Sequence, residues 1–308
     1  MAKYVGKRLL HLLFILVALS FLTFLLMYLT PGDAAVKKLS AQGIAVSDEV
    51  LEHTRHDMGL DRPFLVQYGD WALGILRGDL GTSYKDGQSV GAKLTAGLKN
   101  TVLLAFGSLL LALVVALPLS VLCAVRRDGV LDRILRFFSF IGNSLPNFLI
   151  SVLLMYYFCV KLKLLPVTAD RSLKGLLLPV LALSIPMCGR FLRQFRAEVL
   201  EQLGRPYVGG ARARGVTARK ILFRNVLHNA SISILTIVGL SIGTLMGGSV
   251  VIETIFRWPG LGKLAMDAIS ARDYPVIQGF VLLTAAIYVG VNLLTDIAYR
   301  WVDPRVRT

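Results

Sequence analysis

Residues 101–125 read TVLLAFGSLLLALVVALPLSVLCAV, and none of these 25 side chains is charged. About 20 apolar residues in a helix are enough to cross the hydrocarbon core of a bilayer. Inside that core the backbone must satisfy its own hydrogen bonds, which a helix does within one segment. The stretch therefore predicts a membrane-spanning helix, and its length disfavours the alternative of a buried helix in a soluble protein.

Further apolar blocks lie on both sides of this stretch. Of the 308 residues, 55% are hydrophobic and 17% are charged, which is an unusual apolar excess for a soluble domain. The sequence therefore predicts an all-α integral membrane protein with about six transmembrane helices. They are expected at residues 9–30, 101–125, 137–160, 174–195, 231–255 and 276–299.

Charged residues and prolines interrupt some of these spans. Arg190, Arg193 and Arg196 fall in or just after the second half of the fourth span. They either extend toward the interface or belong to a helix that continues into water. Prolines inside spans are tolerated where neighbouring helices or a cavity satisfy the freed carbonyls. They are Pro118, Pro146, Pro179 and Pro186.

The N-terminus resembles a secretory signal at first sight. Lys3, Lys7 and Arg8 precede the apolar run 9–30. That run is too long for a typical signal core, and no small-residue cleavage site follows it. We expect an uncleaved first span.

The distribution of basic residues predicts the orientation. Short cytoplasmic loops carry an excess of Lys and Arg. An even number of spans places both termini on one side, and 19 of the 34 Lys and Arg residues fall on that side. We therefore expect both termini in the cytoplasm. The segments that carry these 19 residues are the N-terminus, 126–136, 190–224 and 300–308.

The same topology divides the chain into three parts. Residues 1–30 form the cytoplasmic N-terminus and first span, 31–100 an extracytoplasmic segment, and 101–308 the membrane core. Within 31–100, Ser47 is a candidate N-cap for a short helix. Turns are expected at Gly78, Gly81 and Gly87.

Neither cysteine nor histidine spacing predicts a metal site. Cys123, Cys159 and Cys188 all lie in apolar stretches without CxxC spacing, as expected of small packing residues. His53 and His56 form an HxxH pair that no further ligand completes. We expect no metal site.

The net charge of +15 would raise the question of nucleic acid in a soluble protein. Here the basic residues flank apolar spans, which favours a role in orientation. No partner nucleic acid is expected.

The segment 203–230 reads LGRPYVGGARARGVTARKILFRNVLHNA. Pro206 suits the first turn of a helix, Gly215 can end that helix, and Thr217 can cap a second one. The second helix would carry an apolar stripe opposite basic residues. The stripe consists of Ala218, Ile221, Leu222 and Val226.

Two interpretations of this segment remain open on physical grounds alone. An exposed amphipathic element can dock into the groove of a partner protein. It can equally lie on anionic lipid head groups through its arginines. A nucleic-acid interface is disfavoured, because no aromatic residues alternate with the basic ones.

The segment also resembles a known motif. In ABC importer permeases an EAA triplet is followed by three residues and a glycine, and here Gly209-Gly210-Ala211 and Gly215 occupy these places. YVGGARARG and HNA are similar to the peptide/nickel branch of that family. Further similar stretches follow in family order: LTPGD (29–33), GLDRPFLVQY (59–68), GDLGTS (78–83), SLPNF (144–148), VVIETIFRWPGLG (250–262), ARDYPVIQG (271–279) and DPR (303–305).

The chain departs from the motif in two places. Glycine replaces the acidic residue and the first alanine of the triplet, and Ser231-Ile232-Ser233 stands where a proline usually follows the HNA element. These departures concern the docking details rather than the role.

The resemblance implies a type I ABC importer permease fold with coupling helices near residues 205–229, which fit a cleft on the ATPase. Tyr207, Val208, Ala211 and Gly215 would form the contact core, and the arginines at 212, 214 and 219 its polar rim. The coupling residues implied are Tyr207, Val208, Gly209, Gly210, Ala211, Arg212, Arg214, Gly215 and Asn229.

The resemblance also implies partners. They are a second homologous permease, two ABC ATPase subunits that bind ATP and magnesium, an extracytoplasmic substrate-binding protein, and the lipid of a bacterial cytoplasmic (inner) membrane. The substrate would be a peptide, or nickel or another metal chelate. The stretches HNAS, VVIETIF and RDYPVIQ are slightly closer to nickel-type members. The motifs do not decide between these substrates.

No catalytic motif fits its required context. The chain has no GxxxxGK[ST] loop, so it is not expected to hydrolyse ATP or to bind a cofactor. A GxSxG match at 239–243 lies in an apolar span without the strand–turn–helix of a hydrolase. Gly239, Gly243 and Gly247 recur every four residues, which favours close helix packing instead.

Polar residues inside spans are the candidates for the translocation pathway. An ion-driven secondary transporter is the alternative function, but it needs more intramembrane ionisable residues than these. The pathway or packing candidates are Asn143, Ser144, Pro146 and Asn147, and further polar residues are Glu253, Asn292 and Asp296.

Overall fold

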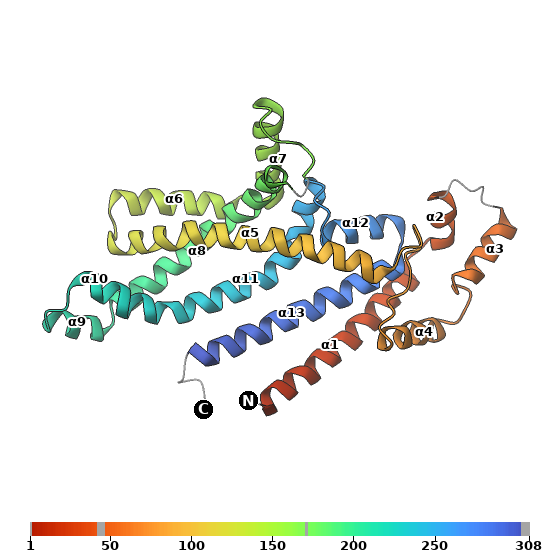
Figure 1. Ribbon diagram of the computed structural model, residues 1–308, viewed down its shortest axis with the longest axis horizontal. Coiled ribbons are helices and arrows are strands. Elements are labelled where there is room, and N and C mark those ends of the chain that lie inside the picture. The colour runs from red at the N-terminus through yellow and green to blue at the C-terminus, as the bar shows by residue number, and fades with distance from the viewer. Residues whose placement is uncertain (1, 42–46, 170–171, 303–308) are drawn as a thin grey trace. The chain divides into compact units, whose positions relative to one another are not determined.

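The computed structural model describes residues 2–41, 47–169 and 172–302. This part of the chain is built from helices and contains no β-strand (Figure 1). Five of its helices are long and apolar enough to cross a membrane, or six if one bent pair counts as a single span. The predicted all-α membrane architecture is confirmed.

Five long helices correspond to predicted spans, but most extend beyond them. They are α1 (Ala2–Leu29), α5 (Val90–Val125), α8 (Leu173–Leu203), α11 (Leu227–Ile255) and α13 (Tyr274–Val302). The prediction placed the starts and ends by hydropathy alone. Helices continue past the apolar run wherever the flanking residues can also form a helix.

The third predicted span, 137–160, is corrected by the structure. It consists of α6 (Val130–Ser144), followed by α7 (Asn147–Met155) and the π-helical segment η1 (Tyr156–Lys161), and the chain bends by 98° at the break. Leu145 is extended at the break, with ψ 131°. A residue before proline disfavours the α conformation, so Pro146 ends α6.

The other predicted interruptions do not break a helix. Pro118 lies inside α5, and Pro179 and Pro186 lie inside α8. Arg190 and Arg196 are also part of α8, which runs on to Leu203. The helix therefore continues past these arginines, and whether they reach the interface or water stays a prediction.

The chain divides into two compact units. Unit 1 comprises Met1–Thr101 and Pro259–Gly290, and unit 2 comprises Val102–Trp258 and Val291–Thr308. The N-terminal part of α5 and most of α13 therefore belong to unit 1.

Unit 1 adds four shorter helices to α1 and these parts of α5 and α13. They are α2 (Ala34–Ala41), α3 (Asp48–Asp57), α4 (Phe64–Leu76) and α12 (Leu261–Ala271). The predicted cap of α3 is confirmed, because the Ser47 side chain accepts a hydrogen bond from the backbone of the helix.

A buried hydrogen-bonded junction ties distant parts of unit 1 together. The predicted turns at Gly78, Gly81 and Gly87 have φ values of 80°, 76° and 69°. Ser83 lies between the last two of them, and its hydroxyl donates to the carboxylate of Asp273 over 2.5 Å. These two residues are 190 positions apart and each is only 2% exposed.

Further contacts of this junction involve the start of α12. The side-chain amide of Asn100 donates to the carbonyl of Pro259 over 2.6 Å, and the Leu261 amide donates to the hydroxyl of Thr101 over 2.8 Å. Gly97 lets Leu261 approach, because an added Cβ would lie 3.2 Å from the Leu261 backbone nitrogen.

The end of α1 joins the same junction. Arg272 donates to the carbonyl of Pro31 over 2.5 Å. Its guanidinium lies on Gly32, where a Cβ would be 2.5 Å from Cζ and where φ is +114°. Asp33 then accepts from the amide of Ala35 at the start of α2. We call these residues the unit 1 junction: Pro31, Gly32, Asp33, Ser83, Tyr84, Gly97, Asn100, Thr101, Pro259, Leu261, Arg272 and Asp273.

In unit 2, α6 packs along α8. Arg196 donates two hydrogen bonds, of 2.8 and 2.7 Å, to the fully buried carboxylate of Asp132. The hydroxyl of Ser139 donates to the carbonyl of Gly189 over 2.5 Å. An added Cβ at Gly189 would lie 2.5 Å from the Ser139 carbonyl oxygen, so the two helices meet at van der Waals distance.

Candidate functional site

The basic segment after α8 forms a helix–turn–helix at one end of unit 2 (Figure 1). Arg205 is extended, with φ −71° and ψ 146°, and α9 (Pro206–Ala213) follows with Pro206 in its first turn. The ring of proline fixes φ near the helical value and needs no amide donor there. This is the helix that Pro206 predicted.

The α9 helix is anchored from inside. Val208 is 1% and Ala211 4% exposed, and both pack into a hydrophobic cluster with Val199 of α8. This cluster fixes α9 against the ends of α5 and α8. Its other buried members are Ala124, Ile221, Val226 and Ala230.

A glycine turn ends α9. Gly215 has φ +74°, and its amide donates to the carbonyl of Arg212 over 2.9 Å. The amide of Val216 donates to the carbonyl of Ala211 over 3.1 Å. A left-handed residue with these two bonds is the usual way to satisfy the last carbonyls of a helix.

The second helix is longer than predicted. Thr217 is extended and precedes α10 (Ala218–Lys220), which continues through η2 (Ile221–Val226) into α11 without a break. The short second helix expected from the sequence is thus the start of a span. A movement of the turn at Gly215 would act directly on α11.

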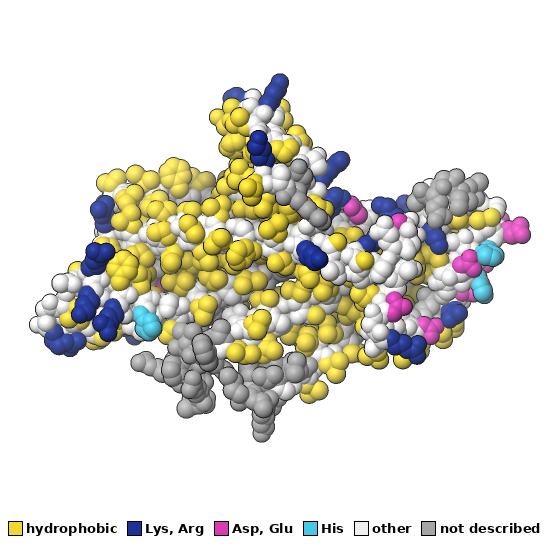
Figure 2. Space-filling view, viewed as in Figure 1, with side chains coloured by type: hydrophobic (Ala, Val, Ile, Leu, Met, Phe, Trp, Pro, Cys, Tyr) yellow, Lys and Arg dark blue, Asp and Glu magenta, His cyan; other side chains and the backbone are white. Residues whose placement is uncertain are grey.

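The outward side of the turn is positively charged. Residues 205–230 contain no acidic side chain. The exposed positions include two small residues, Gly209 and Ala213, among the arginines. Figure 2 shows Lys and Arg side chains gathered over this end of unit 2. The exposed basic residues are Arg205, Arg212, Arg214, Arg219, Lys220 and Arg224.

A groove runs beside this face, with a volume of about 640 Å³. Its floor is apolar, with Val125 from α5 and Leu200 and Leu203 from α8. Arg212 and Arg219 line it on the side of the turn. The arrangement suits a partner segment that has an apolar side chain for the floor and a negatively charged group close by for the arginines.

The structure places the residues of the predicted contact core partly inside the turn and partly on its surface. Val208 and Ala211 point inward, so they hold α9 in place and do not form an outer surface. Tyr207 is half-buried, and its hydroxyl donates to Gln202 over 3.1 Å. Asn229 is exposed and donates to the carbonyl of Asn225 over 2.9 Å. The surface left for a partner consists of Gly209, Arg212, Ala213, Arg214 and Gly215, with Gly210 half-buried.

The polar pathway candidates of the third span meet at the α6–α7 bend. Asn143, Ser144 and Pro146 are exposed, and Asn147 begins α7 half-buried. They lie within five consecutive residues, so their proximity follows from the sequence and not from the break at the proline. Whether they line a pathway stays a prediction.

The three glycines spaced four residues apart in α11 are Gly239, Gly243 and Gly247, and they differ in how closely other parts of this chain approach them. A Cβ at Gly239 would clash with the side chain of Thr295 of α13, so this glycine permits close packing. Gly243 is buried, whereas Gly247 is exposed and has open space where its Cβ would be. Of the other polar candidates, Glu253 is fully buried, Asn292 is half-buried, and the side chain of Asp296 lies outside the described residues.

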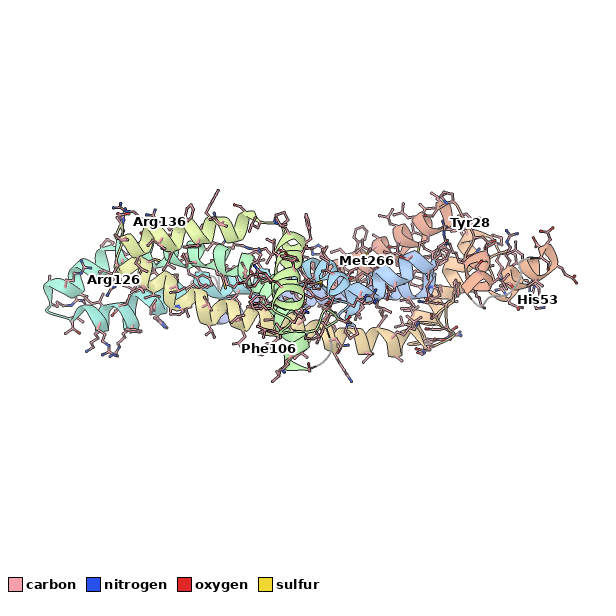
Figure 3. The ribbon with its side chains drawn as sticks, turned by 90° about the horizontal axis from the view of Figure 1, so that it is seen from above. Tyr28, His53, Phe106, Arg126, Arg136 and Met266 are labelled. Atoms are coloured by element: carbon pink, nitrogen blue, oxygen red, sulfur yellow. The ribbon has the colours of Figure 1, made fainter. Side chains whose placement is uncertain are left out.

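No pattern in the sequence indicates the ion pair of Asp132 and Arg196. Arg196 was visible only as an interruption of a span, and nothing in the chain marks Asp132 as its partner. Arg126 and Arg136 lie at the same end of unit 2, where α5 passes to α6 (Figure 3). Arg136 approaches Asp132 to 3.5 Å.

A cavity of about 730 Å³ in unit 1 was also missed. Its wall combines aromatic side chains of Phe24, Trp71 and Tyr84 with the charged pair of Arg62 and Asp70. Burial, together with the nearby carboxylate of the unit 1 junction, raises the pKa of Tyr84 to about 12. Tyr84 is therefore a neutral hydrogen-bonding group at physiological pH.

No metal centre is visible in the described part of the chain, where no three His, Cys, Asp or Glu side chains come together. His53 instead lies 3.0 Å from Asp57 on the surface of α3. The cysteines are free, with Cys123 and Cys159 buried and Cys188 half-buried.

Two family models match the chain. Residues 116–308 match the binding-protein-dependent transport system inner membrane component, and residues 1–105 match the N-terminal part of such a membrane component.

Curated relatives match over nearly their whole length. The metal-staphylopine import system permease protein CntB of Staphylococcus aureus is 36% identical over 100% of this chain and 99% of its own. The glutathione transport system permease protein GsiC of Pectobacterium atrosepticum is 37% identical over the same shares.

A solved structure shares the fold. An inward-facing structure of the MetNI methionine ABC transporter superposes with a TM-score of 0.59 at 21% identity, covering 68% of this chain and 96% of that one. At this identity the match supports the fold alone.

Proposed function

The chain belongs to the family of inner membrane components of binding-protein-dependent transport systems, and on this premise we propose that the turn at Gly215 couples it to an ATPase. As a member of that family it is a multi-pass inner membrane protein and a permease subunit of an ABC importer. The family thus favours ATP-driven import over the ion-driven alternative. The hydrolysis of ATP belongs to separate subunits.

The coupling role rests on one observation. The α9 helix has an exposed, basic, small-residue face, while Val208 and Ala211 anchor it rigidly on α8 and α11 from the other side. A rigid element with an open outer face can transmit the movement of a partner. Through η2 that movement reaches α11, one of the candidate membrane spans.

The assembly that we propose contains two such ATPases with ATP and magnesium, a second related permease and an extracytoplasmic substrate-binding protein. The turn and both termini face the cytoplasm in this proposal. The Lys and Arg bias of the short loops supports that orientation.

For the substrate we propose a short peptide or a metal chelate, including a nickel chelate. The support comes from relatives whose names specify glutathione and metal–staphylopine. Titration of the substrate-binding protein with short peptides, free nickel and nickel chelates distinguishes these classes. The proposal would be overturned if none of these ligands bound saturably.

The coupling proposal is tested by charge reversal at Arg212. This side chain is exposed, so Arg212→Glu leaves the internal cluster intact. We expect at least a tenfold loss of copurified ATPase, because like charges brought together at an interface cost several kcal/mol of binding free energy. The measurement is the ratio of ATPase to tagged permease after purification from membranes.

Lys85→Glu is the matched control, because it makes the same reversal at an exposed position of unit 1. It is expected to keep the wild-type ratio. Equal ATPase association in wild type and Arg212→Glu would disprove a contact at this face.

A further inference from the structure

The α4 helix has an apolar composition that does not suit a helix in water. Its sequence is FLVQYGDWALGIL, with Asp70 as the one charged residue, and none of its residues is buried in this chain. At 100° per residue, Gln67, Asp70 and Gly74 share one narrow side of the helix. The remaining circumference is apolar or aromatic.

One apolar side of α4 packs on α1. Phe64 lies edge-to-face on Phe21, with ring centroids 5.6 Å apart, and Tyr68 lies in the same way on Phe24 at 5.5 Å. Trp71 contacts Phe24 at 6.0 Å. Figure 1 shows α4 beside the C-terminal half of α1. These contacts place residues 64–71 of α4 next to a membrane span.

A hydrogen bond fixes the depth of that contact. The hydroxyls of Tyr68 and Ser20 are 2.9 Å apart. Ser20 lies in the middle of the apolar stretch Leu10–Leu29. At 1.5 Å per residue it is about 14 Å from Leu29 along the helix. The hydrocarbon core is about 30 Å thick, so part of α4 lies at hydrocarbon depth.

The other apolar side of α4 is uncovered. Leu65 is 70%, Leu73 52% and Leu76 83% exposed, and these residues share one face of the helix with Val66. The polar side is different, since Asp70 pairs with Arg62 at 2.9 Å and both line the cavity of unit 1.

We propose that α4 is a membrane-embedded helix whose leucine face contacts lipid acyl chains, in the leaflet that meets the C-terminal end of α1. The occupant is lipid because the tyrosine–serine bond holds the helix beside a span, at a depth where no water is available. The aromatic side holds α4 on α1, and the polar side separates the cavity of unit 1 from the bilayer. Residues 31–100 are then not wholly outside the membrane.

The test is a spin label at Leu73 in the assembled transporter, reconstituted into phosphatidylcholine vesicles. The background replaces Cys123, Cys159 and Cys188 by alanine, and copurification of the partner subunits checks its assembly. Labelled Leu73→Cys is expected to be relaxed strongly by oxygen, which dissolves in lipid, and to lose relaxation by water-soluble chromium oxalate. Labelled Leu76→Cys gives a second site if the first variant fails to assemble.

Two positions of unit 1 calibrate the result. Phe14→Cys, 73% exposed in the middle of α1, reports lipid, and exposed Lys85→Cys reports water. Agreement of the Leu73 label with Phe14 supports the proposal. Agreement with Lys85 overturns it, and so does a label shielded from both reagents, which would mean that a protein subunit covers α4.

Discussion

Two regions of this permease carry family-like sequence motifs for opposite physical reasons. In the unit 1 junction the motif residues Ser83, Leu261 and Asp273 face inward, and Asp273 accepts hydrogen bonds from Ser83 and from the backbone of Tyr84. At the turn of unit 2, Gly209 and Arg212 face outward, and a Cβ at Gly209 would meet nothing within 4 Å.

The difference teaches that a motif does not by itself mark a contact surface. The buried junction residues act inside the protein, since their hydrogen bonds hold together segments that are far apart in the chain. The turn has internal residues too, Val208 and Ala211, but its glycine and the arginines at 212, 214 and 219 are exposed. Substitutions in the two regions should therefore have separable effects on folding and on assembly.

The largest effect is expected for Asp273→Ala. It leaves the Ser83 hydroxyl and the Tyr84 amide without their acceptor in a buried site, which costs about 3 kcal/mol of unfolding free energy. The midpoint of thermal unfolding in detergent should fall, and a protease should cut near residue 84.

Two variants control this prediction. Asp273→Asn keeps an oxygen that can accept from the Tyr84 amide, so its unfolding free energy should fall much less than that of Asp273→Ala. Asp70→Ala breaks an exposed pair with Arg62, for which a cost of about 0–1 kcal/mol is expected. If Asp273→Ala is no more harmful than Asp70→Ala, the junction is not what holds unit 1 together.

A smaller loss is expected for Gly32→Ala, about 2 kcal/mol. Its φ of +114° is strained for any residue with a Cβ, and the new methyl group would meet the guanidinium of Arg272, which is held by the carbonyl of Pro31. Thermal unfolding of the purified permease measures the loss.

The two causes separate in a double-mutant cycle. Arg272→Ala removes the clash but not the backbone strain, so Gly32→Ala should cost less in that background than in the wild type. Gly87→Ala, at φ +69° in open space, gives the cost of a left-handed backbone without any clash. Equal costs in both backgrounds would show that the close approach to Arg272 is unimportant.

Local signals in the sequence predicted local structure well. Ser47 caps α3, Pro206 begins α9, and Gly215 ends it with a positive φ. Each of these residues acts within a few positions of itself, through its own φ preference or its side-chain oxygen. The number of membrane helices followed from hydropathy for the same reason.

Long-range features could not be predicted. Asp132 and Arg196 are 64 positions apart, and only packing of α6 on α8 brings them together. A helix breaks at Pro146 but continues through Pro118, although both prolines lie in apolar stretches, so the local sequence does not distinguish them. Val208 likewise faces inward because α8 packs against it, and the sequence of the motif carries no information on where α8 lies.

The smallest effect, and the most discriminating one, is expected for Gly209→Ala. Replacing glycine by alanine inside a helix gains about 0.5–1 kcal/mol, and here the methyl group meets no atom of the chain. The isolated permease should therefore unfold at a slightly higher temperature. If Gly209 lies against the ATPase, the same methyl group occupies contact space, and less ATPase should copurify. A gain in stability together with a loss of association cannot come from damage to the fold, because damage would lower both. An unchanged ATPase ratio would place Gly209 outside the contact and restrict the coupling face to the arginines.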